Sequence, residues 1–380
     1  METKRNIIIV YHTLPQYRFD FFNLLNDKLI NIDRSLVVIA GTSMGQKEIK
    51  EINGEHSFSI DRYRRTGFSL FGFQIQWGIG LIQKVFDYKP EQVIFMYNAG
   101  ILNYSLLMLL LRCKKIPYMI WGSGHRRVGL NDFQYKVKYL FKNAFMKMAS
   151  GYIAYSEHYA KQLERSGFDK ERLFCAQNTI NVERIIRNRK RRQSTDLNIV
   201  FKFLFVGALI PQKNIDKSIY VCSQLRDEKY EFVYDIVGGG AIINDLKATV
   251  EAMKLENIVV LHGPKYGEEV ASFFRTADAF ILPGTGGLAI NEAMAYGLPI
   301  IATPGDGTGY DLIRNGENGF LLEFDYSLNE LYDVMKYLLL CGNVKRYKMG
   351  EKGLEILKNR ATLNKMVNNF YKAIMKNKQN

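Results

Sequence analysis

Short apolar runs rich in Ile, Val and Phe alternate along the chain with longer stretches in which apolar residues recur at helical spacing. Consecutive apolar positions are typical of parallel strands buried on both faces, and the stretches between them fit crossover helices. The pattern therefore predicts an α/β chain with two Rossmann-like parallel sheets. The expected strands lie at residues 7–11, 36–40, 92–96, 118–121 and 152–155 in the first half, and at 203–206, 233–237, 258–261, 279–282 and 299–302 in the second.

The apolar periodicity is interrupted between residues 180 and 200. The sequence IIRNRKRRQSTDLN in this region is polar and strongly basic, which is typical of a linker between domains. We therefore expect one domain at residues 1–185, a basic linker at 186–200 and a second domain at 201–358. Residues 359–380 are expected to form a final helix.

The segment from 281 to 313, ILPGTGGLAINEAMAYGLPIIATPGDGTGYDLI, predicts a strand, a glycine turn, a helix, a strand and a second glycine turn in succession. Gly284, Gly286 and Gly287 allow a tight turn, and the helix is expected to begin at Leu288. The unpaired N–H groups and positive dipole end of that helix then face the turn, where an anion can bind. Glu292 follows about one turn into the helix, so its carboxylate could accept hydrogen bonds from a sugar hydroxyl beside that anion.

Further polar candidates follow other expected strands, at the edge where open parallel sheets bind ligands. Gly207 comes directly after the strand at 203–206, and Lys213, a few residues later, could neutralise a diphosphate. A solvated surface charge is the alternative for Lys213. Tyr17 and Arg18 follow the first strand, where Arg18 could bind a phosphate or carboxylate of an acceptor, or both side chains could simply pack the first helix.

Composition and charge narrow the class of protein. With 380 residues, 47% hydrophobic and 24% charged, the chain is long enough for two globular domains. Its net charge of +14 indicates an anionic partner such as a nucleotide or a phospholipid surface, and no nucleic-acid-binding motif accompanies that charge. The four cysteines lack C-x-x-C spacing, which argues against a zinc site or a disulfide framework and fits a reducing cytoplasm.

Two observations concern membranes. The apolar run near the N-terminus is too short for a signal peptide, and the run at 101–111 falls short of the roughly 20 residues that span a bilayer. The basic segment at 138–149, KYLFKNAFMKMA, mixes Lys with Tyr, Phe and Met at helical spacing, which suits contact with an anionic membrane surface. A core helix whose lysines reach the solvent is the alternative. We therefore expect a cytoplasmic protein, with peripheral contact at the inner face of the cell membrane as a further hypothesis.

The motifs of the second half resemble those of the nucleotide-sugar-dependent glycosyltransferases of family four, which have the GT-B fold. In that family a Glu, seven residues and a second Glu span the glycine turn and helix; the second is Glu292 here, whereas Gly284 stands in place of the first. The family's Gly-Arg pair followed by Lys appears as GALIPQK, with Gly207 and Lys213 retained and Ala208 in place of the Arg. These two departures remove one donor-sugar contact and one phosphate contact.

The resemblance implies two Rossmann-like domains facing across a cleft, with the acceptor bound by the first, the nucleotide sugar bound by the second, and residues 359–380 packing back on the first. It implies catalytic roles for Lys213 and for His125, which closes IWGSGH after the strand at 118–121, although a histidine held only by local hydrogen bonds is the alternative. Asp311, after PGDGTGY, falls where the family often has an acidic residue, and could equally cap a helix. The donor site implied by the resemblance comprises Gly207, Gly284, Gly286, Gly287, Leu288 and Glu292, and the acceptor side comprises Tyr17 and Arg18.

The resemblance implies a retaining hexosyltransferase that moves a sugar from a nucleoside diphosphate donor to a glycan or lipid-linked acceptor, as in the synthesis of bacterial surface polysaccharide or lipopolysaccharide. No metal ion or other cofactor is expected to be obligatory, and no nucleic-acid partner is expected. Two alternatives stay open. Loss of the first Glu and of the Arg suggests a non-catalytic GT-B protein that binds a nucleotide, a glycan or a partner enzyme. Sugar-nucleotide epimerases also use paired Rossmann-like domains.

Overall fold

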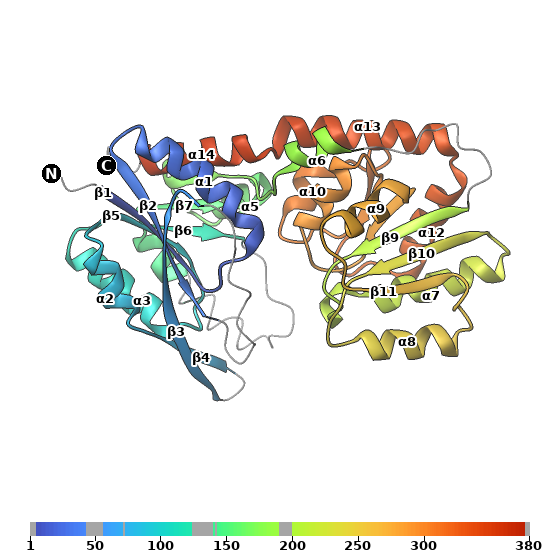
Figure 1. Cartoon of the computed structure of the whole chain (residues 1–380), viewed down its shortest axis with the longest axis horizontal. Helices are drawn as coiled ribbons and strands as arrows, with labels where there is room; N and C mark the ends of the chain where they lie inside the picture. Colours follow the sequence, from blue (N-terminus) through green and yellow to red (C-terminus); the bar gives the residue numbers. More distant parts are fainter. Residues whose placement is uncertain are drawn as a thin grey trace. The chain divides into compact units, whose positions relative to one another are not determined.

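The computed structural model describes residues 5–42, 56–70, 73–123, 140, 143–189 and 200–376. The chain consists of two compact units (Figure 1). Unit 1 contains the residues up to Gln177 and those from Asn364 onwards, and unit 2 contains Asn178–Leu363. Each unit has its own largely parallel sheet, so the α/β class with two Rossmann-like domains is confirmed. Within the described ranges, no helix combines the length and apolar character needed to cross a bilayer.

The described residues of unit 1 form an eight-stranded sheet in the order β4-β3-β2-β1-β5-β6-β7-β8. Neighbouring strands are parallel except β3 and β4, which form an antiparallel hairpin. The central strands are buried along most of their length, which explains their continuous apolar runs. The strands are β1 (Arg5–Tyr11), β2 (Arg34–Gly41), β3 (Ser59–Leu70), β4 (Phe73–Ile79), β5 (Pro90–Met96), β6 (Tyr118–Gly122), β7 (Gly151–Ala154) and β8 (Leu173–Cys175).

The last helix, α14 (Leu363–Lys376), packs on unit 1. The ring centroid of Phe370 lies 4.9 Å from that of Trp121 and 5.2 Å from that of Phe21. The final helix therefore crosses back to the first half of the chain, as predicted. The other helices described in unit 1 are η1 (Gln16–Arg18), α1 (Phe19–Ile30), α2 (Leu81–Asp87), α3 (Leu102–Cys113), α5 (Glu157–Arg165) and η2 (Lys170–Arg172).

The described residues of unit 2 form a six-stranded parallel sheet in the order β11-β10-β9-β12-β13-β14. The strands are β9 (Phe201–Val206), β10 (Phe232–Val237), β11 (Val259–Gly263), β12 (Ala279–Leu282), β13 (Ile300–Ala302) and β14 (Gly319–Leu321). The helices are α6 (Val182–Asn188), η3 (Pro211–Lys213), α7 (Ile215–Asp227), α8 (Ile243–Ala252), α9 (Glu268–Thr276), α10 (Leu288–Ala295), α11 (Thr308–Leu312), α12 (Leu328–Leu340) and α13 (Asn343–Arg360).

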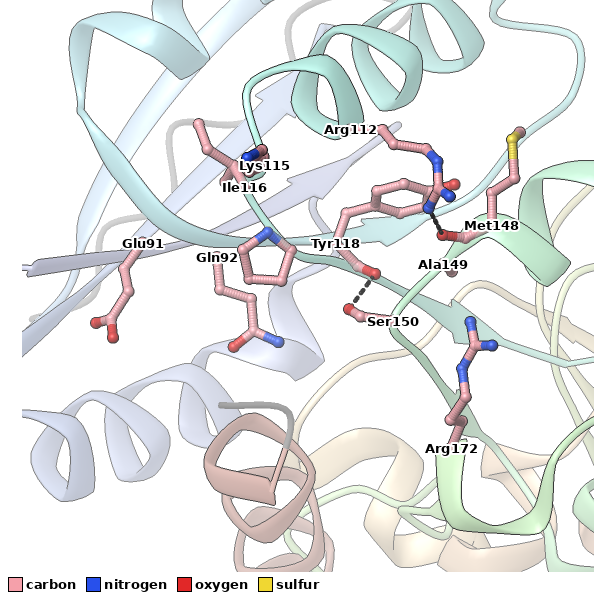
Figure 2. A pocket seen from close by; sticks show the side chains of 11 residues that line it. Glu91, Gln92, Arg112, Lys115, Ile116, Tyr118, Met148, Ala149, Ser150 and Arg172 are labelled. Atoms are coloured by element: carbon pink, nitrogen blue, oxygen red, sulfur yellow. Dashed lines mark hydrogen bonds between the residues drawn. The ribbon is translucent and has the colours of Figure 1, made fainter. Parts of the chain in front are cut away.

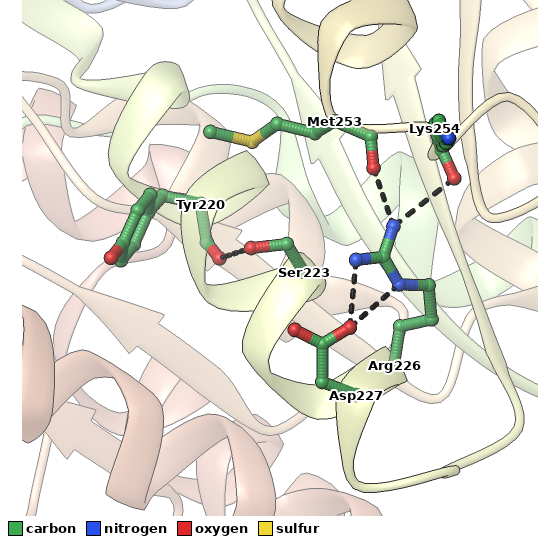
Figure 3. A network of polar contacts seen from close by, with 6 residues as sticks. All are labelled: Tyr220, Ser223, Arg226, Asp227, Met253 and Lys254. Carbon is green, nitrogen blue, oxygen red and sulfur yellow. Dashed lines mark hydrogen bonds and ion pairs between the residues drawn. The ribbon is translucent and has the colours of Figure 1, made fainter.

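A polar cluster at the end of α7 joins that helix to α8 (Figure 3). The guanidinium of Arg226 donates to the carbonyl oxygens of Met253 and Lys254 and pairs with Asp227 at 2.7 Å. The last carbonyl groups of a helix have no hydrogen-bond partners within the helix. The Arg226 guanidinium supplies donors to the carbonyl groups that directly follow α8. This contact fixes the C-terminal end of α7. The N-terminal end of the same helix comes shortly after Lys213.

The edges of the two sheets contain strands that the apolar pattern does not predict. The strands of the β3–β4 hairpin include several Arg, Gln and Gly residues, because an edge hairpin exposes much of its surface and needs no continuous apolar run. β8 and β14 have three residues each, too few to give a recognisable periodicity. The ten strands expected from the sequence are all present, with small shifts at their ends.

Candidate functional site

The glycine turn after β12 is fixed by hydrogen bonds from three neighbouring segments of unit 2. The Pro283 carbonyl oxygen accepts a hydrogen bond from the Tyr326 hydroxyl at 2.9 Å, and the Gly284 carbonyl oxygen accepts one from the Thr303 hydroxyl at 2.7 Å. The backbone N–H of Thr285 donates to the Gln212 carbonyl oxygen at 2.9 Å. The turn is therefore a rigid platform at the carboxyl end of its strand, the edge where parallel sheets bind ligands.

Gly284 lies against the backbone of η3. A Cβ atom at this position would lie 2.2 Å from the Gln212 carbonyl oxygen and 2.5 Å from the carbonyl carbon of Lys213. Distances this short are not tolerated between non-bonded atoms. The backbone of η3 thus occupies the space where a side chain at 284 would begin, and only glycine fits.

Lys213 lies beside the start of α10. Its ammonium group donates to the Thr285 carbonyl oxygen at 2.5 Å, and a Cβ atom on Gly286 would lie 3.1 Å from Nζ. Burial lowers the pKa of Lys213, and the nearby Asp306 carboxylate opposes that shift. An ammonium has three N–H donors, so this partly buried cation can bind an anion as well as hold the turn.

The N-terminus of α10 has no side-chain cap. Gly287 is its N-cap residue, and no side chain hydrogen-bonds there. Leu288 is the first residue of the helix. The backbone N–H groups of the first turn therefore point, with the positive end of the helix dipole, towards the region of Lys213 and Gly286. Cation and helix terminus together favour binding of a phosphate group.

Asp306 is a site residue that the sequence analysis missed. Its carboxylate accepts hydrogen bonds from the Asn178 amide at 2.6 Å and from the Thr308 hydroxyl at 2.5 Å. A Cβ atom on Gly287 would lie 2.4 Å from its Oδ1. Asp306 therefore orders the second glycine turn against the first. The position of an acidic residue between two glycines in PGDGTGY was the available signal, whereas the acidic residue predicted from the sequence was Asp311.

Glu292 is a partly buried carboxyl group on α10. Burial raises its pKa to about 7. In the described part of the chain, no side chain or backbone N–H donates a hydrogen bond to this carboxylate. The neighbouring Asn291 is directed elsewhere, since its amide donates to the Asn178 carbonyl oxygen at 2.8 Å. Glu292 is thus a desolvated acceptor available to a ligand that donates hydrogen bonds.

Gly207 lies at the end of β9 and packs on the glycine loop after β10. Its N–H donates to the Val237 carbonyl oxygen at 3.0 Å, and a Cβ atom on Gly238 would overlap the Gly207 carbonyl oxygen. The next residue, Ala208, is exposed. The structure brings Lys213, Gly284, Gly286 and Gly287 together at one turn, whereas Gly207 belongs to the neighbouring pair of strand ends.

The candidates of unit 1 differ in exposure. Tyr17 is 46% exposed, but Arg18 is only 1% exposed. The guanidinium carbon of Arg18 lies 4.9 Å from the ring centroid of Trp121, and Nη1 lies 3.6 Å from the sulfur of Met366 on α14. In this arrangement Arg18 lies beneath the surface, so its contact with an acceptor stays a prediction. His125 lies outside the described residues.

Comparison with known proteins gives consistent matches. Residues 187–356 match the family described as glycosyl transferases group 1. The chain is 27% identical over 176 residues to the putative colanic acid biosynthesis glycosyltransferase WcaL of Escherichia coli K12, a match that covers 44% of this chain and 42% of that protein. It is 30% identical over 247 residues to an uncharacterized glycosyltransferase of Methanocaldococcus jannaschii, covering 64% of each chain. The matches thus span less than two thirds of either relative.

Solved structures share the fold over nearly the whole chain. The Anabaena protein HepE, solved in complex with UDP, superposes with a TM-score of 0.71 at 16% identity, covering 97% of this chain and 99% of that one. A glycosyltransferase from Rickettsia africae gives a TM-score of 0.72 at 18% identity, with coverage of 98% and 99%. At these identities the similarity concerns the fold, which is GT-B.

Proposed function

We propose that the chain, of which residues 187–356 match the glycosyl transferases group 1 family and which has the GT-B fold, transfers a sugar from a nucleoside diphosphate donor to a glycan or lipid-linked acceptor. One observation carries the proposal: Lys213 contacts the turn that leads into the uncapped start of α10, and α10 also bears Glu292, whose carboxyl has no hydrogen-bond partner among the described residues. A cation with a helix terminus suits a diphosphate, and a carboxylate suits a ribose. The similarity to HepE, solved with UDP, favours UDP as the nucleotide. The similarities to the putative colanic acid glycosyltransferase WcaL and to the lipopolysaccharide outer core galactosyltransferase WaaB favour surface polysaccharide or lipopolysaccharide synthesis.

In this proposal the residues of unit 2 stabilise the leaving group. Bond cleavage leaves negative charge on the nucleoside diphosphate, which the Lys213 ammonium and the N–H groups at the start of α10 would stabilise. Glu292 would accept hydrogen bonds from the ribose hydroxyls and so fix the position of the nucleotide. Gly284 contributes no side chain, so contacts with the sugar come from backbone groups or from other residues.

The remaining features of the proposed reaction follow the family resemblance. We propose that the anomeric configuration is retained, that no metal ion is required, and that His125 lies near the reacting carbon. Nuclear magnetic resonance of the glycoside product measures the configuration directly. Transfer rates in EDTA, compared with rates in Mg²⁺ or Mn²⁺, test the metal requirement. An inverted product, or activity lost in EDTA and restored by metal, would overturn these points.

Calorimetric titration with UDP, GDP and ADP tests the proposed donor site. We expect one of the three, UDP by preference, to bind with one nucleotide per chain. Incubation with a panel of UDP-sugars should then release UDP and form a glycoside. Failure of all three nucleotides to bind would contradict the proposed site, and binding without any turnover would identify a nucleotide-binding protein without transferase activity.

The affinity for UDP is expected to rise with pH through about 7, because burial raises the pKa of Glu292 to that value. Only the ionised carboxylate accepts hydrogen bonds from both ribose hydroxyls. The stability of the protein without ligand depends on pH with the opposite sign. Because the pKa of Glu292 is raised above its ordinary value of 4.5, this stability falls as the pH rises from about 4.5 through about 7. Glu292→Gln should flatten both profiles and weaken UDP binding about tenfold above neutral pH.

Calorimetry and thermal unfolding across this pH range measure both effects. Glu317→Gln, at an exposed position of the same unit, serves as the matched control and should behave like the parent. A pH profile for UDP binding that is identical in Glu292→Gln and the parent would rule out the ribose contact.

We also propose that unit 1 contacts an anionic membrane surface, where a lipid-linked acceptor would be found. In the basic segment 138–149, Phe145 and Met146 are buried, whereas Leu140 is 71% exposed. Phe68, Trp77 and Ile79 are exposed on one face of the β3–β4 hairpin, together with Arg64. An exposed stripe of α3 adds Leu102, Leu106 and Leu109. Aromatic residues beside a basic residue are typical of peripheral membrane contacts.

Replacing Phe68 and Trp77 together by serine should reduce binding to phosphatidylglycerol vesicles at least tenfold, because both apolar side chains would no longer be buried in the lipid. Vesicle cosedimentation measures the change. Tyr266→Ser is the matched control, since Tyr266 is 78% exposed on unit 2. Equal vesicle binding by the parent and the double variant would exclude this surface.

A further inference from the structure

Unit 1 contains a cavity of about 880 Å³ at the amino ends of β5, β6, β7 and β8 (Figure 2). Gln92 lies near the start of β5, Tyr118 is the first residue of β6, Ser150 precedes β7 and Arg172 precedes β8. These strands are parallel neighbours, so their amino ends meet at one edge of the sheet. Ligand sites of such sheets usually lie at the opposite, carboxyl edge. The volume is in the range of cavities that bind small molecules.

Gln92 gives this cavity an unusual polar wall. It is 2% exposed, yet among the residues that the structure describes neither its amide oxygen nor its amide nitrogen has a hydrogen-bond partner. Buried amides are nearly always paired, because an unpaired buried donor or acceptor loses its bonds to water without replacement. Figure 2 shows the amide directed into the space that it shares with Ser150 and Arg172. The amide is placed to meet a molecule with both donor and acceptor groups.

The charged residues of the cavity are predominantly basic. Arg112 donates to the Met148 carbonyl oxygen at 3.4 Å and Arg172 to the Lys147 carbonyl oxygen at 3.2 Å. Each guanidinium has five N–H groups, so both retain donors for a ligand. Lys115 adds a third cation.

The acidic residue of the lining does not cancel this charge. Glu91 is bound by Arg34 through two contacts of 2.9 and 3.3 Å, which neutralise its carboxylate. The cavity therefore has an excess of positive charge as well as an unpaired neutral amide. A phosphate group suits the cations, and a hydroxyl suits the amide.

We propose that this cavity binds a phosphate ester whose neutral part carries hydroxyl groups, such as a sugar phosphate. The site is formed by residues of unit 1 alone and is separate from the Lys213 and Glu292 site of unit 2. The proposal does not depend on the proposed transferase activity. It gives the first unit a ligand of its own, bound at the amino edge of its sheet.

Calorimetry with glucose 1-phosphate, at saturating UDP so that the unit 2 site is filled, tests the proposal on the full chain. We expect binding by the parent, weaker binding of inorganic phosphate and none of glucose. Gln92→Leu and Arg172→Gln should each weaken glucose 1-phosphate binding about tenfold, by losing a hydrogen bond and a charge-assisted one. Gln162→Leu, at an exposed glutamine of α5, is the matched control and should bind like the parent.

Thermal unfolding supplies a second readout. Without ligand, Gln92→Leu should raise Tm by about 2–4 °C, since an unpaired buried amide is replaced by an apolar group. If that variant does not fold, Arg172→Gln still decides the binding result. Phosphatidylglycerol vesicles offer the same chemistry in a lipid headgroup. If Gln92→Leu weakens binding to these vesicles, the ligand is a lipid. If it weakens binding of glucose 1-phosphate, the ligand is a free phosphate ester. The proposal is overturned if the parent binds neither glucose 1-phosphate nor the vesicles, or if the affinities of Gln92→Leu and Arg172→Gln equal that of the parent. It is also overturned if glucose binds as tightly as glucose 1-phosphate.

Discussion

Replacing Lys213 by alanine is expected to lower kcat for sugar transfer about 10²–10³-fold, the range typical of removing one group that stabilises developing negative charge. The ammonium lies beside Gly286 at the start of α10 and is desolvated enough for burial to lower its pKa. A charge in such surroundings interacts with an anion more strongly than one in water. Because the leaving diphosphate gains charge as the bond breaks, the loss should fall mainly on kcat. Release of UDP from UDP-sugars measures it.

The comparison for this variant is Lys247→Ala, which removes an exposed lysine from α8 of the same unit. Its rate should remain within about twofold of the parent, as expected for a surface substitution. Thermal unfolding of Lys213→Ala measures how much stability is lost with the hydrogen bond to the Thr285 carbonyl oxygen. The loss of charge is measured separately, by the fall in kcat. Turnover by Lys213→Ala at the parent's rate would show that diphosphate is stabilised elsewhere.

Gly284→Ala is expected to destabilise the protein by about 1–3 kcal/mol, the cost typical of forcing extra atoms into a packed site. The new methyl group would meet the Gln212 carbonyl oxygen at 2.2 Å, so η3 would have to move. Gly284→Glu introduces the family's residue at this position. It should lose more stability than Gly284→Ala and gain no activity. Moving η3 also displaces Lys213, so UDP binding should weaken in both variants.

Gly239→Ala is the matched control for this substitution. A Cβ atom there meets Pro264 at 3.6 Å, an ordinary contact distance, so its unfolding midpoint should stay close to that of the parent. Denaturant unfolding of the three variants measures the differences. If Gly284→Glu were as stable as the parent and more active, η3 would not lie as close to residue 284 as the structure has it. The glycine at 284 would then only remove a contact with the donor sugar.

The sequence predicts the sheets well because their central strands have local signatures. β1 contains the apolar run 7–11 and β9 the apolar run 203–206, and burial on both faces of the sheet is the physical reason. The β3–β4 hairpin lacks that signature, because its pairing partner and the exposed face of the sheet edge decide its conformation. The fold class thus follows from local pattern, whereas the edges depend on which segments meet.

The same distinction applies to the site. The spacing of Gly284, Gly287 and Glu292 is local and places them on one turn and helix. The contact of Lys213 with Thr285 joins residues 72 positions apart, and that of Arg18 with Met366 joins residues 348 apart. No sequence motif encodes the direction in which such segments approach each other. Hence the sequence could identify Lys213 as a candidate but could not predict the burial of Arg18.

The packing of α14 has a consequence for biosynthesis. Phe370 completes an aromatic cluster with Phe21 and Trp121, and Met366 covers the guanidinium of Arg18. A ribosome releases these two partners only after all of unit 2 has been made. Domains usually fold in order from the N-terminus during synthesis. Here the unit that is made first becomes complete only with the last helix, and Phe21 and Trp121 lack their contact with Phe370 until then.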